Sequence, residues 1–586
     1  MRTKIVSAQL ALAAVAAAWA AASLWPLLAV PVAAALLTPR PLSRRRPAPH
    51  DTAALLRHLH PGGALTATTL DGTELAVLED IDGLAAVLEL GDPVTLASEP
   101  LPPLPLPAAL LPTTAGDAPE IRVQLLITVT PPTEDAAYRS LTGGRVPARR
   151  RVLLTVRARR SGGYARATLE QSLLAAVKRA TRQLQRAEVP VQALSTASAL
   201  EAVEESAGYT PDSPTPLHET RSAVRLGPHD HAAFALTSPG HAALLTKLGA
   251  LPTSSTTLAV TATSRSPAVE TAVRLTAPAD TPAALRQAEE ALRQAGVSLH
   301  RLAGTRLEGL SRTLPFGAAA TGPTAALTGL LTDDRLLASD RLPSGLPNRR
   351  RRNATDHGSR TGRPPTGDRP PTGPATASSG ESAESDAGPT SLDLALGGDG
   401  VVLGLDRHAA PIPIRLFRRL PTRVTLIATL RCARLLITRA ATTGAEVVIQ
   451  STDPRAWAPL LQSGRPTSIT VVDRATNLRT PTPTRPQLVV FDSGPAPAPH
   501  PWRTTLLARP HLRPSDVEAL HESDLVLLQS LPEPQAILAA DALGLHESAA
   551  WLPKVGPDML AIVITGRSIR WANLAPPRHK GHVANR

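Results

Sequence analysis

Side chains that could bind a nucleotide are the first candidates for chemistry in this sequence of 586 residues. A doubly wound sheet holds a pyrophosphate on a glycine-rich turn between its first strand and helix, because glycine lets the backbone approach the phosphates. The corresponding stretch here, Ala428–Ala433, contains no glycine. The pattern G-x-x-x-x-G-K-[ST] does not occur in the sequence, which therefore has no P-loop. We predict that the chain binds no nucleotide and needs no cofactor.

Asp492 ends an apolar stretch that resembles the magnesium-binding strand of P-loop enzymes. That role requires the phosphate-binding loop and its lysine, which the sequence lacks. Ser493 and Gly494 follow directly, and an aspartate before such residues is typical of a turn. We therefore interpret Asp492 as a turn residue.

Two groups of side chains have spacings that occur in metal sites. Asp80 and Asp82 are separated by one residue, as in the D-x-D pairs of sugar-nucleotide transferases. Gly83 follows between two predicted strands, which favours a surface hairpin turn. The histidines at close spacing are His58, His60, His229, His231 and His241. No acidic ligand and base accompany them, so we predict exposed histidines and no bound metal.

The sequence also lacks the residues of common covalent catalysis. Cys432 is the only cysteine, which excludes an intramolecular disulfide framework and a cysteine-built zinc or iron–sulfur site. It lies in an apolar helical pattern, as a small core residue would. No G-x-S-x-G nucleophile elbow occurs. We predict no catalytic residue, and a chain that is not an enzyme.

The net charge of +13 favours an anionic partner, either nucleic acid or a membrane surface. The run Arg349–Arg352 could contact either, but no aromatic residues suited to base stacking lie near it. Nucleic acid is therefore not expected. The first 50 residues carry six basic side chains and no acidic one: Arg2, Lys4, Arg40, Arg44, Arg45 and Arg46.

These basic residues flank an uncharged segment, Ile5–Leu37. Its first part, Ile5–Ala22, would form about 27 Å of helix at ~1.5 Å per residue, close to the ~30 Å of a bilayer core. The second part, Leu24–Leu37, is shorter. Positive charge on both sides predicts a transmembrane hairpin with both ends in the cytoplasm and Arg44–Arg46 at the lipid headgroups. A single tilted span and a cleaved signal peptide remain alternatives.

Small residues in the first predicted span could support contact with another helix. Ala14 and Ala18 lie one turn apart on one face, and small residues let helix backbones approach closely in a membrane. The alternative is that these alanines reflect a GC-rich genome and face lipid.

The rest of the chain divides by composition and pattern into three parts. Residues 51–342 are predicted as a first α/β region, in which a β–β–α–β–α order occurs at 121–207 and again at 224–317, as a duplication would produce. Residues 343–390 contain almost no large apolar side chain, as in a disordered linker. In residues 391–586, apolar strands alternate with helices. That alternation predicts a second α/β domain with a mainly parallel, Rossmann-like sheet.

Several segments together resemble the EccE membrane component of actinobacterial type VII (ESX) secretion systems. They are the hydrophobic segment with its arginines, the meander TLDGTELAVLEDIDGLAAVLEL, the strand RVLLTVRARR with the helix after it, RLEGLSRTLPFGA, and the stretch from GVVLGLDRHAAPIPIRLF to STDPRAW. The resemblance covers most of residues 1–470. The shorter second span and the long linker depart from the family pattern.

The resemblance implies a non-enzymatic structural subunit of a plasma-membrane translocon, with its main body in the cytoplasm. Its partners would be the EccB, EccC and EccD components and plasma-membrane lipids, and EccC would supply ATP hydrolysis. No catalytic residue is carried over from the family. Two other function classes stay open: a membrane-anchored, glycosyltransferase-like enzyme, and a membrane-tethered nucleic-acid binder. The expected fold class is α/β, with a transmembrane hairpin (1–50) followed by the two cytoplasmic modules.

Overall fold

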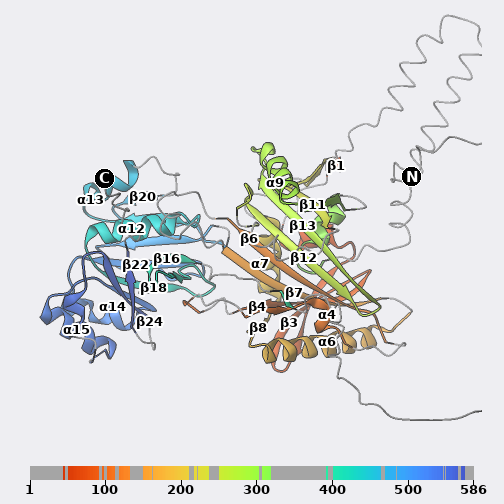
Figure 1. Ribbon diagram of the computed structural model, residues 1–586, viewed down its shortest axis with the longest axis horizontal. Helices are drawn as coiled ribbons and strands as arrows, with labels where there is room; N and C mark the ends of the chain where they lie inside the picture. The colour runs from red at the N-terminus through yellow and green to blue at the C-terminus, as the bar shows by residue number, and fades with distance from the viewer. Residues whose placement is uncertain are drawn as a thin grey trace, which may run out of the picture. The chain divides into compact units, whose positions relative to one another are not determined.

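The computed structural model (Figure 1) describes two β-sheets with helices on both faces of each. The described residues are 44–45, 51–91, 95–97, 102–112, 118–131, 149–160, 163–209, 217–220, 222–236, 248, 250–302, 306–317, 391–392, 400–462, 469–483, 485–545, 547, 550–564 and 569–574. The predicted linker at 343–390 lies outside them. Both sheets belong to one compact unit.

The first sheet has 13 strands, and every pair in it is antiparallel. Its main order is β1-β9-β10-β11-β13-β12-β6-β7-β4-β3-β2, while β14 pairs with β11 and β8 with β4. The strands are β1 (Arg44–Arg45), β2 (Ala64–Leu70), β3 (Thr73–Asp80), β4 (Gly83–Leu90), β6 (Ile121–Thr130), β7 (Arg149–Arg159), β8 (Val191–Ala193), β9 (His218–Glu219), β10 (Val224–Leu226), β11 (His229–Leu236), β12 (Ser255–Thr263), β13 (Ser266–Pro278) and β14 (Leu299–Arg301).

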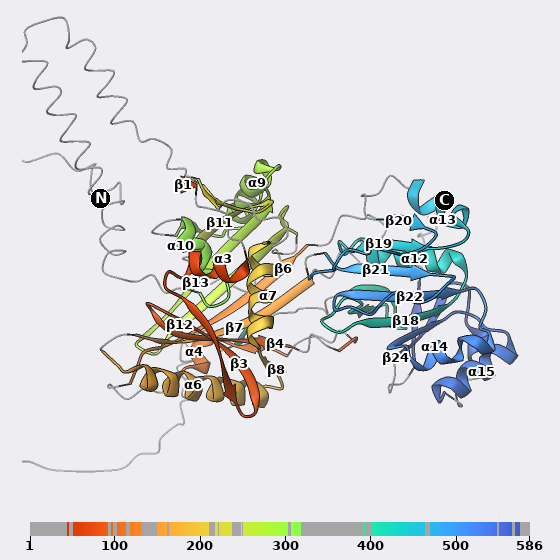
Figure 2. The ribbon, with the colours of Figure 1, turned by 180° about the vertical axis from the view of Figure 1, so that it is seen from behind.

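Alternating side chains bury both faces of this sheet. Along β6, Val123, Leu125 and Ile127 belong to one apolar core, while Leu126 belongs to the core on the opposite face. This follows from the two-residue period of a strand. The first core also contains residues of α4 (Pro107–Leu110), α6 (Arg166–Arg186) and α9 (Pro282–Gln294), and the second contains residues of α3 (Thr52–Leu59), α7 (Thr196–Ala207) and α10 (Arg306–Arg312). Figure 2 shows α3 and α7 in front of the strands.

The first sheet consists of two halves with the same plan. In one half the chain order is β6, β7, α6, β8, α7, and in the other it is β12, β13, α9, β14, α10. Strands β6 and β12 pair with each other, and the strand order outward is the same on both sides: β7-β4-β3 in the first half and β13-β11-β10 in the second. The short strands β8 and β14 add to the corresponding strands β4 and β11. The order β–β–α–β–α thus occurs in both halves, at β6–α7 and at β12–α10.

The hairpins of the first sheet have local causes. Asp71 and Gly72 both have positive φ (49° and 84°), which is the geometry of the two-residue turn predicted there. Gly83 has φ 133°, and a Cβ at that position would lie 2.1 Å from the Ala158 carbonyl oxygen on the neighbouring strand. A side chain at Gly83 would therefore prevent β4 and β7 from pairing closely.

The second sheet has ten strands in the order β17-β16-β25-β24-β23-β18-β22-β21-β19-β20. Six neighbouring strands, β23 to β20 in that order, are parallel, and the other four are antiparallel. The strands are β16 (Val401–Leu405), β17 (Pro411–Ile414), β18 (Thr422–Ile427), β19 (Glu446–Gln450), β20 (Ile469–Val472), β21 (Gln487–Phe491), β22 (Arg503–Arg509), β23 (Leu525–Leu528), β24 (Met559–Ile564) and β25 (Ile569–Asn573).

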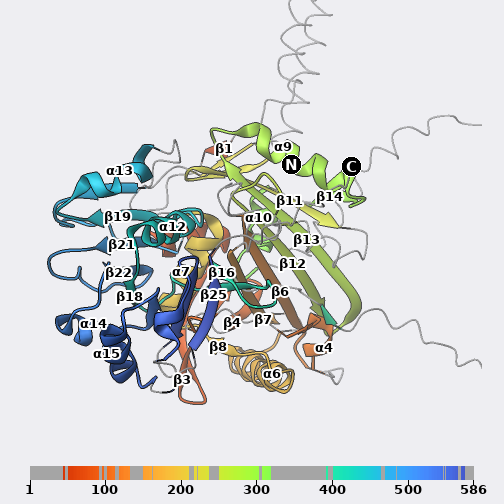
Figure 3. The ribbon, with the colours of Figure 1, turned by 60° about the vertical axis from the view of Figure 1, so that its left-hand side comes forward.

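Helices cover both faces of this second sheet as well. One core contains residues of α12 (Leu430–Ala441) and α13 (Pro454–Gln462), and the core on the other face contains residues of α14 (Val517–His521) and α15 (Glu533–Leu543). Figure 3 shows α12 together with the parallel strands β19, β21, β22 and β18. Two short pairings connect segments that are distant in the sequence. Ala97 forms a β-bridge with Ile414 of β17, and β15 (Ser391–Leu392) pairs with β5 (Leu104–Pro105).

The fold class predicted from the sequence was wrong. The first sheet is antiparallel throughout and the second is mixed, because β16, β17, β24 and β25 run antiparallel to their neighbours. Within the part of the chain that the structure describes, no helix is long and apolar enough to cross a membrane. The predicted hairpin segment Ile5–Leu37 itself lies outside the described residues. The alternation of strands and helices indicated covered sheets but not strand direction, which long-range pairing sets.

Candidate functional site

The turn between β18 and α12 is the first strand–helix turn of the parallel strands, and neighbouring side chains form hydrogen bonds with its groups. Thr429 caps α12, accepting a hydrogen bond from the Cys432 backbone N–H at 3.4 Å. Gln529, at the end of the adjacent β23, accepts hydrogen bonds from both the backbone N–H and the hydroxyl of Thr429, at 3.0 and 2.9 Å. A phosphate held at this turn would need those same donors. The geometry thus agrees with the missing glycines.

Asp492 follows β21, and nearby side chains donate hydrogen bonds to its carboxylate and to its backbone carbonyl. Its carboxylate accepts a hydrogen bond from the Ser451 hydroxyl at 2.5 Å and from the Trp457 indole N–H at 3.4 Å. Arg509 donates to its backbone carbonyl. Among the described residues, no group of three His, Cys, Asp or Glu side chains could hold a metal ion. The arrangement is that of a residue fixing a strand end.

The D-x-D pair lies in the predicted hairpin turn, but its first aspartate is buried. The Arg157 guanidinium donates to both Asp80 carboxylate oxygens, at 2.6 and 2.9 Å, and His60 Nδ1 lies 3.0 Å from Oδ2. Burial alone would raise the pKa of Asp80, but the bond from His60 and the charge and bonds of Arg157 hold that pKa well below its usual range. Asp80 is therefore an ionised partner of an arginine, and both oxygens are occupied.

The prediction of exposed histidines was wrong for the four that the structure describes: His58 and His229 are half-buried, and His60 and His231 are buried. His60 and His231 are each only 2% exposed, and burial lowers the pKa of both imidazoles. His58 is partly buried, with Nδ1 2.8 Å from the Ala54 carbonyl oxygen. His241 lies outside the described residues. The sequence pattern missed this because burial depends on which helices cover each strand face.

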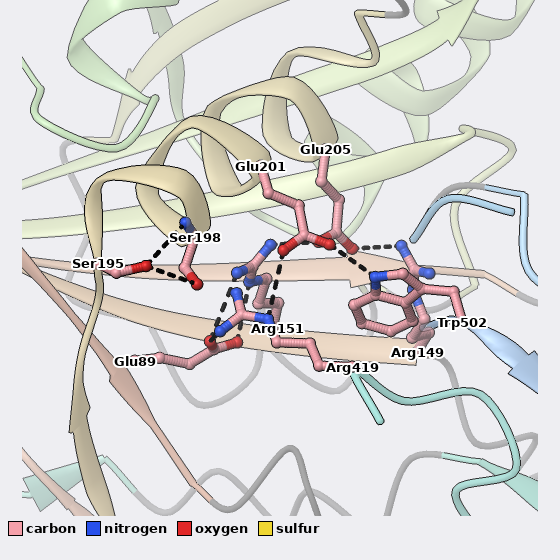
Figure 4. A network of polar contacts seen from close by, with 9 residues as sticks. All are labelled: Glu89, Arg149, Arg151, Ser195, Ser198, Glu201, Glu205, Arg419 and Trp502. Atoms are coloured by element: carbon pink, nitrogen blue, oxygen red, sulfur yellow. Dashed lines mark hydrogen bonds and ion pairs between the residues drawn. The ribbon is translucent and has the colours of Figure 1, made fainter. Parts of the chain in front are cut away.

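A cluster of polar side chains joins the two sheets (Figure 4). From the first sheet, Arg151 on β7 donates to Glu89 of β4 at 3.0 Å and to Glu205 of α7, and Arg149 also donates to Glu205. Two residues of the second sheet region complete it. We call this set of seven residues the inter-sheet network: Glu89, Arg149, Arg151, Glu201, Glu205, Arg419 and Trp502.

The second sheet region contributes Arg419, which follows β17, and Trp502, which precedes β22. The Arg419 guanidinium lies 2.8 Å from a Glu89 carboxylate oxygen and 3.5 Å from a Glu201 oxygen. The Trp502 indole N–H donates to Glu201 at 2.6 Å. These contacts connect residues about 300 positions apart, since Glu201 and Trp502 are separated by 301 residues. The inter-sheet network is thus a joint between the two sheets.

The electrostatics of this joint are balanced. Its three arginines face three glutamates, and the side chains of Glu89, Arg151 and Glu205 are at most 10% exposed. Burial alone would raise the pKa of Glu205, but Arg149 and Arg151 lower it below its usual range. Burial likewise would lower the pKa of Arg151, yet Glu89 and Glu205 raise it. Glu205 and Arg151 are therefore both charged at neutral pH.

A cavity of about 90 Å³ adjoins the inter-sheet network. It lies between residues of the first sheet, including Glu89, Arg149 and Glu205, and residues of the second, including Phe417 and Trp502. The arrangement can hold the sheets together and order water between them.

The residues predicted from the sequence lie largely outside the inter-sheet network. Arg44 and Arg45 form the edge strand β1, which pairs with β9. Arg2, Lys4, Ala14, Ala18, Arg40 and Arg46 lie outside the described residues. The inter-sheet network was missed because its members come from five separate segments. Two signals could have indicated it: Arg149 and Arg151 share one strand face, and Glu201 and Glu205 share one helix face.

Comparisons with known proteins identify no relative that would name the chain's function. No family model and no curated protein matches. Among solved structures, the chain is similar to the genome packaging NTPase B204 from Sulfolobus turreted icosahedral virus 2, in complexes with AMPPCP and with AMP. The identities are 11% and 10%, the TM-score is 0.21 for both, and the match covers 26% of this chain and 97% and 96% of those chains. A similarity of this size carries no conclusion about fold or activity.

Proposed function

We propose that this chain is a structural subunit of a type VII secretion complex at the plasma membrane, and that it performs no catalysis. The observation that carries the structural role is the inter-sheet network, in which buried, mutually neutralised charges join two large sheets into one body. Removal of one partner from such a cluster leaves an uncompensated buried charge, so each member depends on the others.

The strand–helix turn at which a parallel sheet would bind a nucleotide supports the absence of catalysis. Thr429 and Gln529 satisfy each other there, at 2.9 and 3.0 Å. The buried acids Asp80 and Glu205 are paired with arginines and therefore ionised. The assignment to type VII secretion rests on the sequence resemblance to EccE, which also proposes EccB-, EccC- and EccD-type components and anionic lipids as partners.

The test is isolation of the tagged full-length chain from membranes of a host that carries a type VII system. We expect components of the EccB, EccC and EccD types to co-purify in mild detergent. Recovery of the folded chain without any of them would overturn the assignment to secretion. Saturable binding of ATP or a sugar nucleotide to the same preparation would overturn the non-catalytic part and favour an enzyme.

A variant pair tests whether the joint supports assembly. Arg419→Met removes the cation that contacts both Glu89 and Glu201, and we expect lower recovery of the partners. Arg423→Met is the control, because Arg423 pairs with Glu522 at the surface, where both side chains are about half exposed (45% and 56%). Equal recovery of partners with both variants, at equal amounts of folded chain, would show that assembly does not depend on the joint.

A further inference from the structure

Arg274 lies in the interior of the first sheet without a carboxylate partner. It is 0% exposed, near the middle of β13, between Ala233 of β11 and Thr257 of β12. One terminal nitrogen donates to the Thr257 hydroxyl at 2.9 Å. Its Nε and its other terminal nitrogen find no hydrogen-bond partner among the described residues. The guanidinium therefore has donors pointing at no acceptor.

Two histidines extend this cluster along the neighbouring strand. His231, on the same face of β11 and paired with Thr276, has Nδ1 3.1 Å from the Thr276 hydroxyl. Its Nε2 is buried and makes no hydrogen bond of ordinary geometry in the described part of the chain, although a contact with the Ala207 backbone acts to raise the pKa of the ring. Nδ1 of His229, two residues earlier, is in the same position beside the Gly208 backbone. If the Thr276 hydroxyl donates to Nδ1 of His231, then Nε2 carries the proton and is a further donor.

No acidic group of the described residues acts on Arg274. Burial alone lowers the pKa of Arg274, to about 9, which leaves it protonated at neutral pH. Asp230 lies between the two histidines in sequence, but its carboxylate binds Arg225 at 2.8 and 2.9 Å on the other face of the strand. A buried guanidinium without a counter-charge is strongly destabilising, and so are donors left without acceptors.

The surroundings limit what could supply the missing charge. The unpartnered atoms are all nitrogen donors or can be, so a ligand must accept hydrogen bonds and carry negative charge. Helix α10 closes over the cluster, because its Gly309 lies so near Ala233 that a Cβ there would be 3.4 Å from the alanine methyl. The site is thus covered, and it suits a small ion rather than an organic phosphate.

We propose that Arg274 and His231, with the Thr257 hydroxyl, form a buried site for a small inorganic anion of the size of chloride. The anion neutralises Arg274 and accepts the hydrogen bonds that its Nε and terminal nitrogen and the His231 Nε2 would otherwise lack. It is a structural ligand of the second half of the first sheet. This inference is independent of the proposed role in secretion.

The test measures the melting temperature of the full-length chain while chloride replaces gluconate at constant ionic strength, so that charge screening does not change. A ligand that binds the folded state raises the melting temperature by mass action. We expect a rise of several degrees when chloride reaches about 100 times its Kd. An unchanged melting temperature would overturn the proposal and indicate buried water instead.

Two variants show whether the response of the melting temperature to chloride depends on Arg274. Arg274→Met should abolish the response to chloride and, in gluconate, be at least as stable as the wild type, because it removes an uncompensated charge. Arg225→Met is the matched control: Arg225 pairs with Asp230 on the opposite face, and its response should be that of the wild type. A response retained by Arg274→Met would place the anion elsewhere and overturn the proposal.

A direct measurement keeps the proposal falsifiable if Arg274→Met does not fold. Crystals of the wild-type chain soaked in sodium bromide should show an anomalous peak within hydrogen-bond distance of Arg274. Absence of that peak, with bromide bound at other positions in the same crystal, would contradict the site.

Discussion

The two halves of the first sheet bury an arginine on the same face but neutralise it differently. In the first half, Arg157 on β7 binds both carboxylate oxygens of Asp80, on β3. In the second half, Arg274 lies on the corresponding strand β13 and binds the neutral Thr257 hydroxyl. It lies two residues further along the strand from the hairpin turn of its half than Arg157 does in the first half. The repeated backbone plan is thus combined with two different ways of compensating charge.

The hairpin ends show where the halves diverge. Asp80 is the last residue of β3 and pairs with Gly83 across a two-residue turn. The corresponding residue of β10 is Leu226, which pairs with His229 across a turn of the same length. An acid in the first half is therefore an apolar residue in the second. A duplicated fold keeps its strand pairing because backbone hydrogen bonds do not depend on side-chain type, whereas each buried charge needs its own partner.

The largest effect that would test this contrast is expected at Asp80. Asp80→Asn should destabilise the chain by about 3–5 kcal/mol, because it leaves Arg157 buried without its counter-charge. Urea unfolding would measure it. The double variant Asp80→Leu with Arg157→Met should recover most of that loss, since it removes both charges. A loss in the double variant as large as in the single one would mean that packing, not charge, sets the cost.

A smaller gain is expected from giving the second half an acid of its own. Thr257→Asp places a carboxylate beside the Arg274 nitrogen that Thr257 now accepts from. In chloride-free buffer we expect stabilisation of about 1.5–3 kcal/mol, the range for hydrogen bonds to charged groups, and no further response to chloride. Thr257→Val is the control: it removes the hydroxyl without adding a charge and should not produce this stabilisation. Thermal unfolding with and without chloride would show both effects.

Lowering the pH should distinguish the two halves of the first sheet, because a different group titrates in each. The pKa of Asp80 is lowered in the folded state, so its stabilisation is complete only well above the unfolded pKa of 3.8 and is lost progressively as pH falls from about 5 toward the folded pKa. His231 has a lowered pKa as well, so protonation of the unfolded state reduces stability already as pH falls through about 6.5. Unfolding free energies from pH 7 to 3 should therefore be less steep below pH 5 in Asp80→Leu with Arg157→Met, and less steep between pH 7 and 5 in His231→Asn. Unchanged slopes in both variants would contradict these assignments.

The smallest effect is expected where an ion pair lies at the surface. Lys178 and Asp71 form a pair at 2.7 Å, but the side chains are 41% and 71% exposed. Lys178→Met should change the unfolding free energy by at most about 1 kcal/mol, and less at high salt. A loss comparable with that of Asp80→Asn would show that burial does not explain the difference between the pairs.

Much of the local structure could be predicted from the sequence. Apolar periodicity in the sequence agrees with the helices at 282–294 and 430–441. Ser195, a residue type that favours helix N-caps, caps α7 by accepting from the Ser198 N–H at 3.3 Å. Asp71 and Gly72, residue types that favour hairpin turns, both have positive φ. These features depend on apolar periodicity, caps and turn residues, all of which act within a few positions along the chain.

Only the tertiary structure decided which of these elements meet. The 13-stranded sheet depends on β6 pairing with β12, between residues such as Leu126 and Ala259. The inter-sheet network joins Glu201 to Trp502, and the charge state of Asp80 depends on Arg157, 77 positions away. Whether His231 is exposed follows from the helices that cover its strand face. Sequence patterns record what a residue does for its own element, but burial and charge compensation are properties of the contacts between elements, and these form only when distant segments pack.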